Sequence, residues 1–117
     1  MEPIWTDPVT GLEWGPTAPN QMAWQAAMDW CAKQGDGWRL PTIDELFSIV
    51  DYSRYEPAIV EPLRAGTVSS YYWSSTTYAV YPSSAWYVSF HNGNVSYLGK
   101  TFSYYVRAVR GGSAVTS

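Results

Sequence analysis

The second half of this sequence contains no acidic residue. All ten Asp and Glu residues lie within residues 1–65, and residues 66–117 carry only three charged groups, Lys100, Arg107 and Arg110. With four basic residues, the first part has a net charge of −6, and the second has +3. A segment without carboxylates offers calcium no charged ligand, and three cations are too few to neutralise a run of phosphates. We therefore expect no calcium site in residues 66–117 and no nucleic-acid partner.

Cysteine and long apolar runs are also scarce. Cys31 is the only cysteine, so an internal disulfide is excluded, and its place in a helical pattern predicts a small core residue. No apolar run approaches the roughly 20 residues that span a bilayer, so we expect no membrane insertion. Glu2 and Pro3 stand where a signal peptide would have basic and apolar residues, so no signal peptide is expected in this chain.

The groups that usually carry catalysis are sparse as well. His91 is the only histidine, and although serines surround it, chance proximity explains that arrangement better than a nucleophile and its base. The acidic pair Asp44-Glu45 fits the start of a helix, and Glu56 and Glu61 lie in an irregular stretch that we expect to face water. No glycine-rich phosphate-binding motif occurs. We predict no enzyme, no metal site and no cofactor.

What the chain does have is aromatic residues. They make up 17% of its 117 residues, mostly Tyr and Trp, while charged residues make up only 15%. A disordered chain is charge-rich and poor in aromatics, so a folded domain is expected. We predict a single domain over 1–117, with a helical scaffold in 1–65 and a strand-rich, ligand-displaying part in 66–117.

Helices are predicted only in the first part. Residues 4–14 form a hairpin around a Pro-Val-Thr-Gly turn, and 21–34 form a helix with Asn20 as its N-cap. Thr42 and Glu45 make a capping box for a second helix that runs through Val50. Residues 53–70 are irregular.

The second part is predicted to be strands, near residues 71–76, 85–91, 94–99 and 104–110. The order of a hairpin, two helices and then strands indicates an α+β fold, with the helices packed on a small twisted antiparallel sheet. The predicted core residues are Trp38, Trp73, Trp86, Phe90, Val106 and Val109. One of Arg107 and Arg110 is expected to be buried and bonded to backbone carbonyls.

The hairpin AWYVSFHNGNVSYLGK, residues 85–100, has an outer face without charge. If Asn92-Gly93 is a two-residue turn, Ser89 lies opposite Ser96. The outer face then collects Tyr87, Ser89, His91, Asn94, Ser96 and Leu98. The inner face collects Trp86, Val88, Phe90, Val95 and Tyr97, and a slip of one residue would turn Tyr97 outward.

Tyrosine among small polar residues is typical of antibody-like binding surfaces, because it offers a rigid ring and a hydroxyl. Tyrosine is also simply favoured in strands, which is the alternative explanation. Eight tyrosines among serines, with no acid, favour a binding face: Tyr71, Tyr72, Tyr78, Tyr81, Tyr87, Tyr97, Tyr104 and Tyr105.

An ordered set of motifs carries a resemblance. WTDPVTGLEW, a Trp-containing helix with Cys31, WRLPTIDEL, YWSST, AWYVSFHNGNV and YVRAVR follow one another across nearly the whole chain. In this order they resemble the C-terminal domain family of the Legionella collagen-like adhesin. The resemblance implies a C-type-lectin-like fold, in the variant found in formylglycine-generating enzymes.

The resemblance extends to variable proteins of diversity-generating retroelements. Those systems randomise template adenines, and AAY codons then yield Tyr, Ser, His, Asn, Leu, Val, Gly or Phe, but not Trp or Lys. Every expected display position holds such a residue, and these are the candidate ligand-binding residues: Tyr78, Val80, Tyr81, Ser84, Tyr87, Ser89, His91, Ser96, Tyr97, Leu98, Gly99, Phe102, Ser103 and Tyr104.

The same resemblance removes two activities. Formylglycine generation needs active-site cysteines in the C-terminal part of the fold, and this part has none. The Glu-Pro-Asn, Gln-Pro-Asp and Trp-Asn-Asp motifs of calcium-dependent lectins do not occur in 66–117.

The sequence therefore predicts a non-catalytic domain that binds an unknown protein or glycan, on a cell surface or virion. The alternative is a surface adhesin that binds sulfated glycans through Lys100, Arg107 and Arg110, multiplied by assembly into a homo-oligomer.

Overall fold

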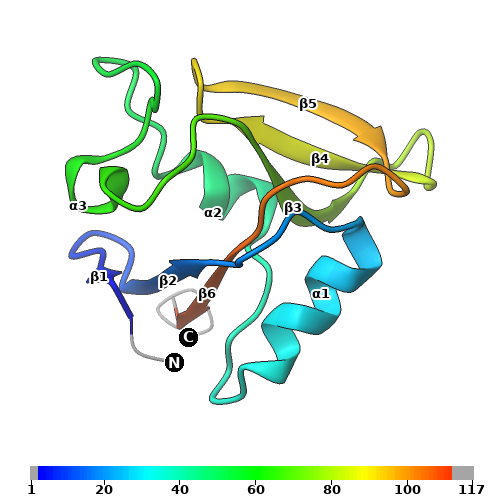
Figure 1. Cartoon of the computed structure of the whole chain (residues 1–117), viewed down its shortest axis with the longest axis horizontal. Helices are drawn as coiled ribbons and strands as arrows, with labels where there is room; N and C mark the ends of the chain where they lie inside the picture. The colour runs from blue at the N-terminus through cyan, green and yellow to red at the C-terminus, as the bar shows by residue number, and fades with distance from the viewer. Residues whose placement is uncertain (1–2, 112–117) are drawn as a thin grey trace.

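Strands from opposite ends of the chain meet in the first of two sheets. The computed structural model describes residues 3–111 (Figure 1). In it, β1 (Trp5–Thr6) and β2 (Leu12–Thr17) form the predicted hairpin, and β2 pairs antiparallel with β6 (Arg107–Gly111). β6 begins later than predicted because Tyr104 and Tyr105 make single bridges to other partners, Met22 and Tyr72.

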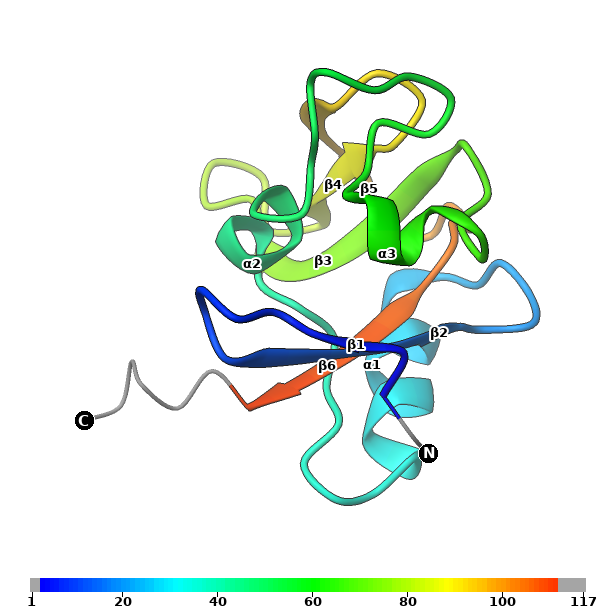
Figure 2. The same ribbon diagram turned by 90° about the vertical axis from the view of Figure 1, so that its left-hand side faces the viewer.

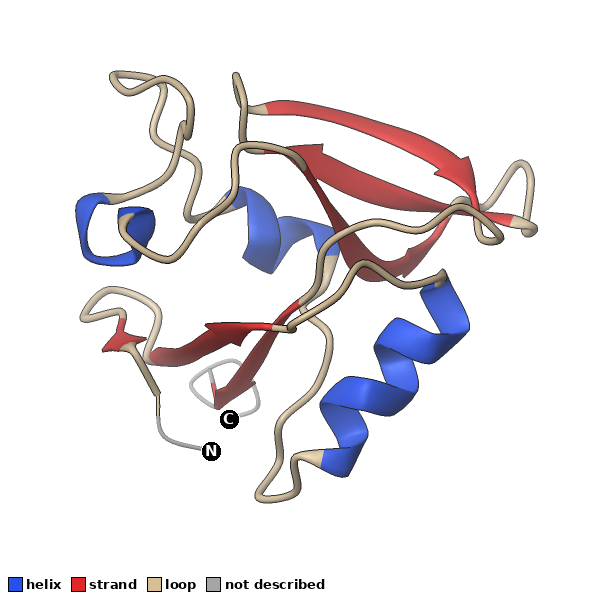
Figure 3. Cartoon of the chain, in the orientation of Figure 1, coloured by secondary structure: helices blue, strands red, loops and turns tan. Residues whose placement is uncertain are grey.

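The second sheet is the antiparallel meander β3-β4-β5. It comprises β3 (Tyr71–Thr77), β4 (Ser84–Ser89) and β5 (Asn94–Gly99). β5 lies at the outer edge of the molecule, at the top of Figure 1. The α+β class is therefore confirmed, but the single predicted sheet is wrong: the described residues form two three-stranded sheets, which Figure 3 shows in red.

Three short helices accompany the sheets in residues 3–111, rather than the predicted two. They are α1 (Trp24–Lys33), α2 (Ile43–Phe47) and α3 (Glu61–Arg64). Figures 1 and 2 both place α2 and α3 between the β1-β2-β6 sheet and the β4–β5 hairpin. No described helix combines the length and apolarity that crossing a membrane requires.

The start of α1 corrects a prediction. Its N-cap is Ala23, not Asn20, and no side chain caps it. The reason is that Met22 exchanges both backbone hydrogen bonds with Tyr104, at 2.9 and 3.0 Å, which holds the chain extended up to that point. A tertiary pairing thus overrides the local capping preference.

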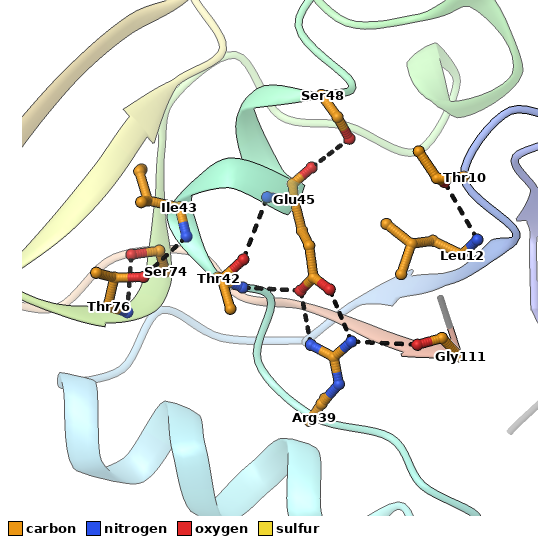
Figure 4. A network of polar contacts seen from close by, with 10 residues as sticks. All are labelled: Thr10, Leu12, Arg39, Thr42, Ile43, Glu45, Ser48, Ser74, Thr76 and Gly111. Atoms are coloured by element: carbon orange, nitrogen blue, oxygen red, sulfur yellow. Dashed lines mark hydrogen bonds and ion pairs between the residues drawn. The ribbon is translucent and has the colours of Figure 1, made fainter. Parts of the chain in front are cut away.

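The capping box of α2 is confirmed (Figure 4). Thr42 Oγ1 accepts a hydrogen bond from the Glu45 N–H, and Glu45 Oε1 accepts one from the Thr42 N–H. The helix ends earlier than predicted, because Val50 leaves it to bridge Ile59.

The buried side chains form two clusters. The first joins α2 to both sheets through Trp14, Leu46, Tyr72, Phe90 and Val109, among others. The second lies beside α1 and includes Cys31, Trp38, Trp73, Val106 and Ala108. The predicted core residues are buried except for Trp86, which is only half-buried. Its ring packs against Tyr78 and against Tyr97 of the edge strand β5, and Tyr97 is itself exposed.

Candidate functional site

The β4–β5 hairpin turns through four residues, 90–93, instead of two. Ser89 lies opposite Asn94 and Tyr87 opposite Ser96, so the predicted pairing of Ser89 with Ser96 is wrong by two residues. Phe90 accounts for the difference, since its N–H donates to the Ser70 carbonyl and its own carbonyl accepts from Ala58 N–H. Those bonds tie Phe90 to the body of the molecule and remove it from the hairpin ladder.

A shift of two residues leaves every side chain on its predicted face. Tyr87 and Ser96 share one face, and Trp86 and Tyr97 share the other. The side of Tyr97 is thereby determined: it lies on the Trp86 face, which is exposed at this edge, and Tyr97 is 37% exposed.

Eight residues from two segments of the chain, 69–71 and 87–94, surround a hollow on the Tyr87 face. Its volume is about 320 Å³. The lining residues are uncharged, with hydroxyl, amide, imidazole and phenol groups: Ser69, Ser70, Tyr71, Tyr87, Ser89, His91, Asn92 and Asn94. We call this feature the serine–tyrosine hollow.

Three lining residues were predicted as ligand-binding, namely Tyr87, Ser89 and His91. Ser89 is nearly buried, at 5% exposure, rather than fully outward. It lies directly opposite Tyr71 of the neighbouring strand β3. The sequence did not mark Ser69 and Ser70 as site residues. They reach the hollow only because the Phe90 N–H bonds to the Ser70 carbonyl, a long-range contact without a local signal.

His91 lies at the rim of the hollow with three polar neighbours. Its Nε2 is 3.0 Å from the Tyr55 hydroxyl, and its Nδ1 is 3.4 Å from Ser69 Oγ and 3.7 Å from the Glu56 carboxylate. In a nucleophile relay, the hydroxyl and the carboxylate bind opposite ring nitrogens. Here both approach Nδ1, so the arrangement is not the relay that would activate Ser69.

A row of aromatic rings continues from the hollow along the same face. The Tyr71 centroid is 4.7 Å from that of Tyr87 and 5.2 Å from that of Tyr104. Tyr104 also packs against Trp73, at 5.0 Å. Burial, and then the neighbouring phenols of Tyr87 and Tyr71, raise the pKa of Tyr104 above its ordinary value. Tyr104 is therefore partly structural, not a freely exposed display residue.

Other predicted ligand-binding residues lie on the opposite face. Tyr78 stacks on Tyr97 with centroids 3.9 Å apart, and Tyr81 lies 5.8 Å from Tyr78. Val80 and Tyr81 are exposed in the β3–β4 loop, at 64% and 57%. The predicted set is thus divided between two surfaces.

The remaining members are spread along the hairpin and the segment after it. Ser96 and Leu98 continue the Tyr87 face of β5, and Ser84 pairs with Gly99 at the end of the hairpin away from the hollow. Phe102 and Ser103 are exposed in the segment that leads to β6.

The three cations of the C-terminal part are engaged within the protein. Arg107 is 2% exposed and donates to the Gly15 carbonyl at 2.7 Å, which confirms that one of the two arginines is buried on a backbone carbonyl. Arg110 forms an ion pair with Glu13 and lies over the Trp38 ring. Lys100 lies over the Trp24 ring, 4.0 Å from its centroid. The buried Arg107 offers nothing to a sulfate group.

No curated protein sequence matches the chain. A family model does: the Lcl C-terminal domain model matches residues 3–110. The match takes in both sheets except Gly111 at the end of β6, the three helices of residues 3–111 and the serine–tyrosine hollow. The chain therefore belongs to the Lcl C-terminal domain family.

Proposed function

We propose that this domain recognises a target without catalysis and binds it in the serine–tyrosine hollow. The observation that carries the proposal is the lining, which combines two tyrosines with small hydroxyl and amide side chains that carry no formal charge. Tyrosine rings give contact area at a low entropy cost, and the small polar groups give adaptable hydrogen bonds. The target is a protein or glycan surface, met by a domain held on a cell surface or virion.

The finer proposal is a C-type-lectin-like variable protein of a diversity-generating retroelement. It is supported by the contrast between buried and exposed positions in the segment 71–104. Trp73 is fully buried and unreachable from an AAY codon, whereas Val80, Tyr81 and Phe102 are exposed and reachable. Ser89 supports it differently: a larger side chain at this nearly buried position would fill part of the hollow and change its shape.

Binding is tested on an array of neutral, sialylated and sulfated glycans, followed by NMR titration of the strongest glycan into ¹⁵N-labelled protein. We expect shifts at Ser69, Ser70 and Asn94, and at least a tenfold loss of affinity for Tyr87→Ala. The matched control is Tyr81→Ala, which removes an exposed tyrosine from the opposite face and should leave affinity unchanged. Equal losses in both variants would contradict the proposed site.

The same array distinguishes binding in the uncharged hollow from the alternative, in which the domain is an adhesin for sulfated glycans. Binding through cations weakens steeply with salt. Binding that falls sharply between 50 and 500 mM NaCl, and falls again for Lys100→Ala, would favour the adhesin. Binding that is insensitive to both favours the uncharged hollow.

The variable-protein proposal has a genomic test. We expect a near-identical copy of the segment coding for residues 70–110 close to the gene, differing only at adenines and next to a reverse transcriptase. A locus without such a copy would remove this part of the proposal and leave the binding role intact.

A further inference from the structure

No strand within residues 3–111 pairs with the outer edge of β5, where only the terminal Gly99 carbonyl accepts a backbone hydrogen bond, from the Phe102 N–H at 3.1 Å. In the sheet order β3-β4-β5, β5 is hydrogen-bonded to β4 on one side only. The single bridges outside the named strands involve other segments of the chain. β5 is six residues long and lies at the periphery of the molecule (Figure 1).

The hydrogen-bond pattern shows which groups face outward. The Phe90 N–H donates to Ser70, on the β3 side, and Val88 lies opposite Tyr72 in the same alternation. Successive residues of a strand direct their N–H and C=O groups to opposite sides. The backbone groups of Ser89 and Tyr87 therefore face β5, where they pair with Asn94 and Ser96. By the same alternation, the backbone groups of Val95 and Tyr97 point away from β4.

The side chains of those two residues are exposed as well. Val95 and Tyr97 are each 37% exposed, on the same face of the strand. Natural sheets protect a free edge with lysine, proline, a bulge or a covering loop. The sequence of β5, NVSYLG, has no charged residue and no proline, and its pairing with β4 is regular along its whole length. This is an edge that can accept another strand.

We propose that β5 pairs antiparallel with β5 of a second copy of this chain, about a twofold axis at Ser96. In this register, Val95 lies opposite Tyr97 of the second copy, and the converse, so that both exposed side chains gain a cross-strand partner of the favoured aromatic and β-branched type. The outward backbone groups of Val95 and Tyr97 form the hydrogen-bonded pairs. The two Ser96 residues face each other in the non-hydrogen-bonded position.

A second copy is the occupant that the edge itself favours. The strand is self-complementary about Ser96, since its two exposed apolar residues, Val95 and Tyr97, lie one place to either side. It carries no acidic or basic residue, so two copies meet without charge repulsion, and the nearest cation, Lys100, is held by Thr77 Oγ1 and the Trp24 ring. A twofold axis normal to the sheet places both serine–tyrosine hollows on the same face of one six-stranded sheet.

Disulfide trapping tests the register directly. Residues in a non-hydrogen-bonded antiparallel pair have Cα atoms about 4.5 Å apart, within disulfide range. We expect Ser96→Cys to form a covalent dimer at least tenfold faster than the control Val9→Cys, in which an 89% exposed residue lies in the β1–β2 turn. The native Cys31 is fully buried and does not interfere.

Charge exchange provides the second measurement, by sedimentation equilibrium. The wild-type mass should rise from 13.1 kDa towards twice that value with concentration. Ser96→Lys and Ser96→Glu should each stay folded and monomeric, with melting temperatures that do not depend on concentration, and an equimolar mixture of the two should regain the dimer. Equal trapping rates for the two cysteine variants would overturn the proposal. The proposal would also be overturned by a dimer that Ser96→Lys does not weaken, or by a mixture of the Lys and Glu variants that remains monomeric. Either result would stand against a second copy as the partner even if the β5 edge accepts a strand from another protein.

Discussion

The two sheets of this domain differ in how they use charge. The β1-β2-β6 sheet contains Glu13, Arg107 and Arg110, each bonded to a specific partner. The β3-β4-β5 sheet contains no charged residue in any of its strands, and its partly exposed side chains contact mainly one another, as Tyr78 contacts Tyr97. Both are three-stranded and antiparallel, so architecture does not explain the difference.

The difference indicates a division of roles. A charged group with a fixed partner penalises substitution, because the partner is left unpaired. Aromatic and small side chains in mutual contact at a surface can be exchanged at lower cost. The charged contacts of the first sheet should therefore resist substitution, whereas the surface side chains of the second sheet, to which we assign the proposed binding role, should tolerate it more readily. The predictions below test how strictly this division holds.

The largest effect is expected for Arg107→Ala. This change removes the hydrogen bonds to the Gly15 carbonyl, Thr17 and Thr67 and leaves a cavity in the interior. We expect the free energy of unfolding to fall by about 3–5 kcal/mol, measured by urea denaturation. The control, Arg54→Ala, removes a surface cation and should cost less than about 1 kcal/mol. A similar cost for both variants would show that the first sheet does not depend on its buried cation.

A smaller effect is expected at Tyr104, which is in the predicted ligand-binding set but packs against the buried Trp73. Tyr104→Ala loses its contacts with Trp73 and Tyr71 and should cost about 2–3 kcal/mol. Phe102→Ala, at a ring 54% exposed and 6.4 Å away from Tyr104, should cost less than about 1 kcal/mol. If thermal melts show the same loss of stability for both variants, burial at Tyr104 does not separate a structural residue from an exposed one.

Glu45 gives a smaller, pH-dependent effect. Partial burial acts to raise its pKa, but hydrogen bonds from Arg39 and Thr42 outweigh burial, so the pKa lies below its ordinary value. A carboxyl group with a lowered folded-state pKa contributes stability that is present above the unfolded pKa and is lost as the pH falls through the folded pKa. Glu45→Gln should thus cost about 1 kcal/mol at pH 7 and nothing near pH 2. A cost independent of pH would exclude the ionic contribution.

The smallest effect is expected in the β3–β4 loop. Val80 and Tyr81 are among the most exposed apolar residues described, so Val80→Ser and Tyr81→Ser should each change the free energy of unfolding by less than about 0.5 kcal/mol. Chemical denaturation of the double variant measures the combined change in the free energy of unfolding. A loss above 2 kcal/mol would mean that these positions carry the fold and are not free to vary.

The sequence predicted the elements that depend on local rules. The first hairpin, the Thr42–Glu45 capping box and the β3, β4 and β5 strands follow from turn chemistry, capping and alternation. It failed where distant segments pair. The start of α1 depends on Met22 bonding to Tyr104, and the partition into two sheets depends on β2 selecting β6.

The site shows the same limit. Alternation assigned Tyr87 and Ser96 to one face, and the even register shift preserved that result. Alternation could not show that both faces of this sheet are partly covered, so it treated Tyr104 and Ser89 as free. Nor could it place Ser69 and Ser70 at the hollow, because the contact that positions them spans 20 residues between Ser70 and Phe90.

The pairing of β2 with both β1 and β6 has a consequence for how the domain can be inserted into another protein. Trp5 and Val109 both lie opposite Trp14, one on each side of it. Two strand spacings separate them, about 10 Å. Figure 1 places β1 and β6 at the end of the molecule opposite the β4–β5 hairpin. A module built in this way can be grafted into a surface loop of an unrelated host without stretching that loop, with its aromatic hairpin pointing away from the junction.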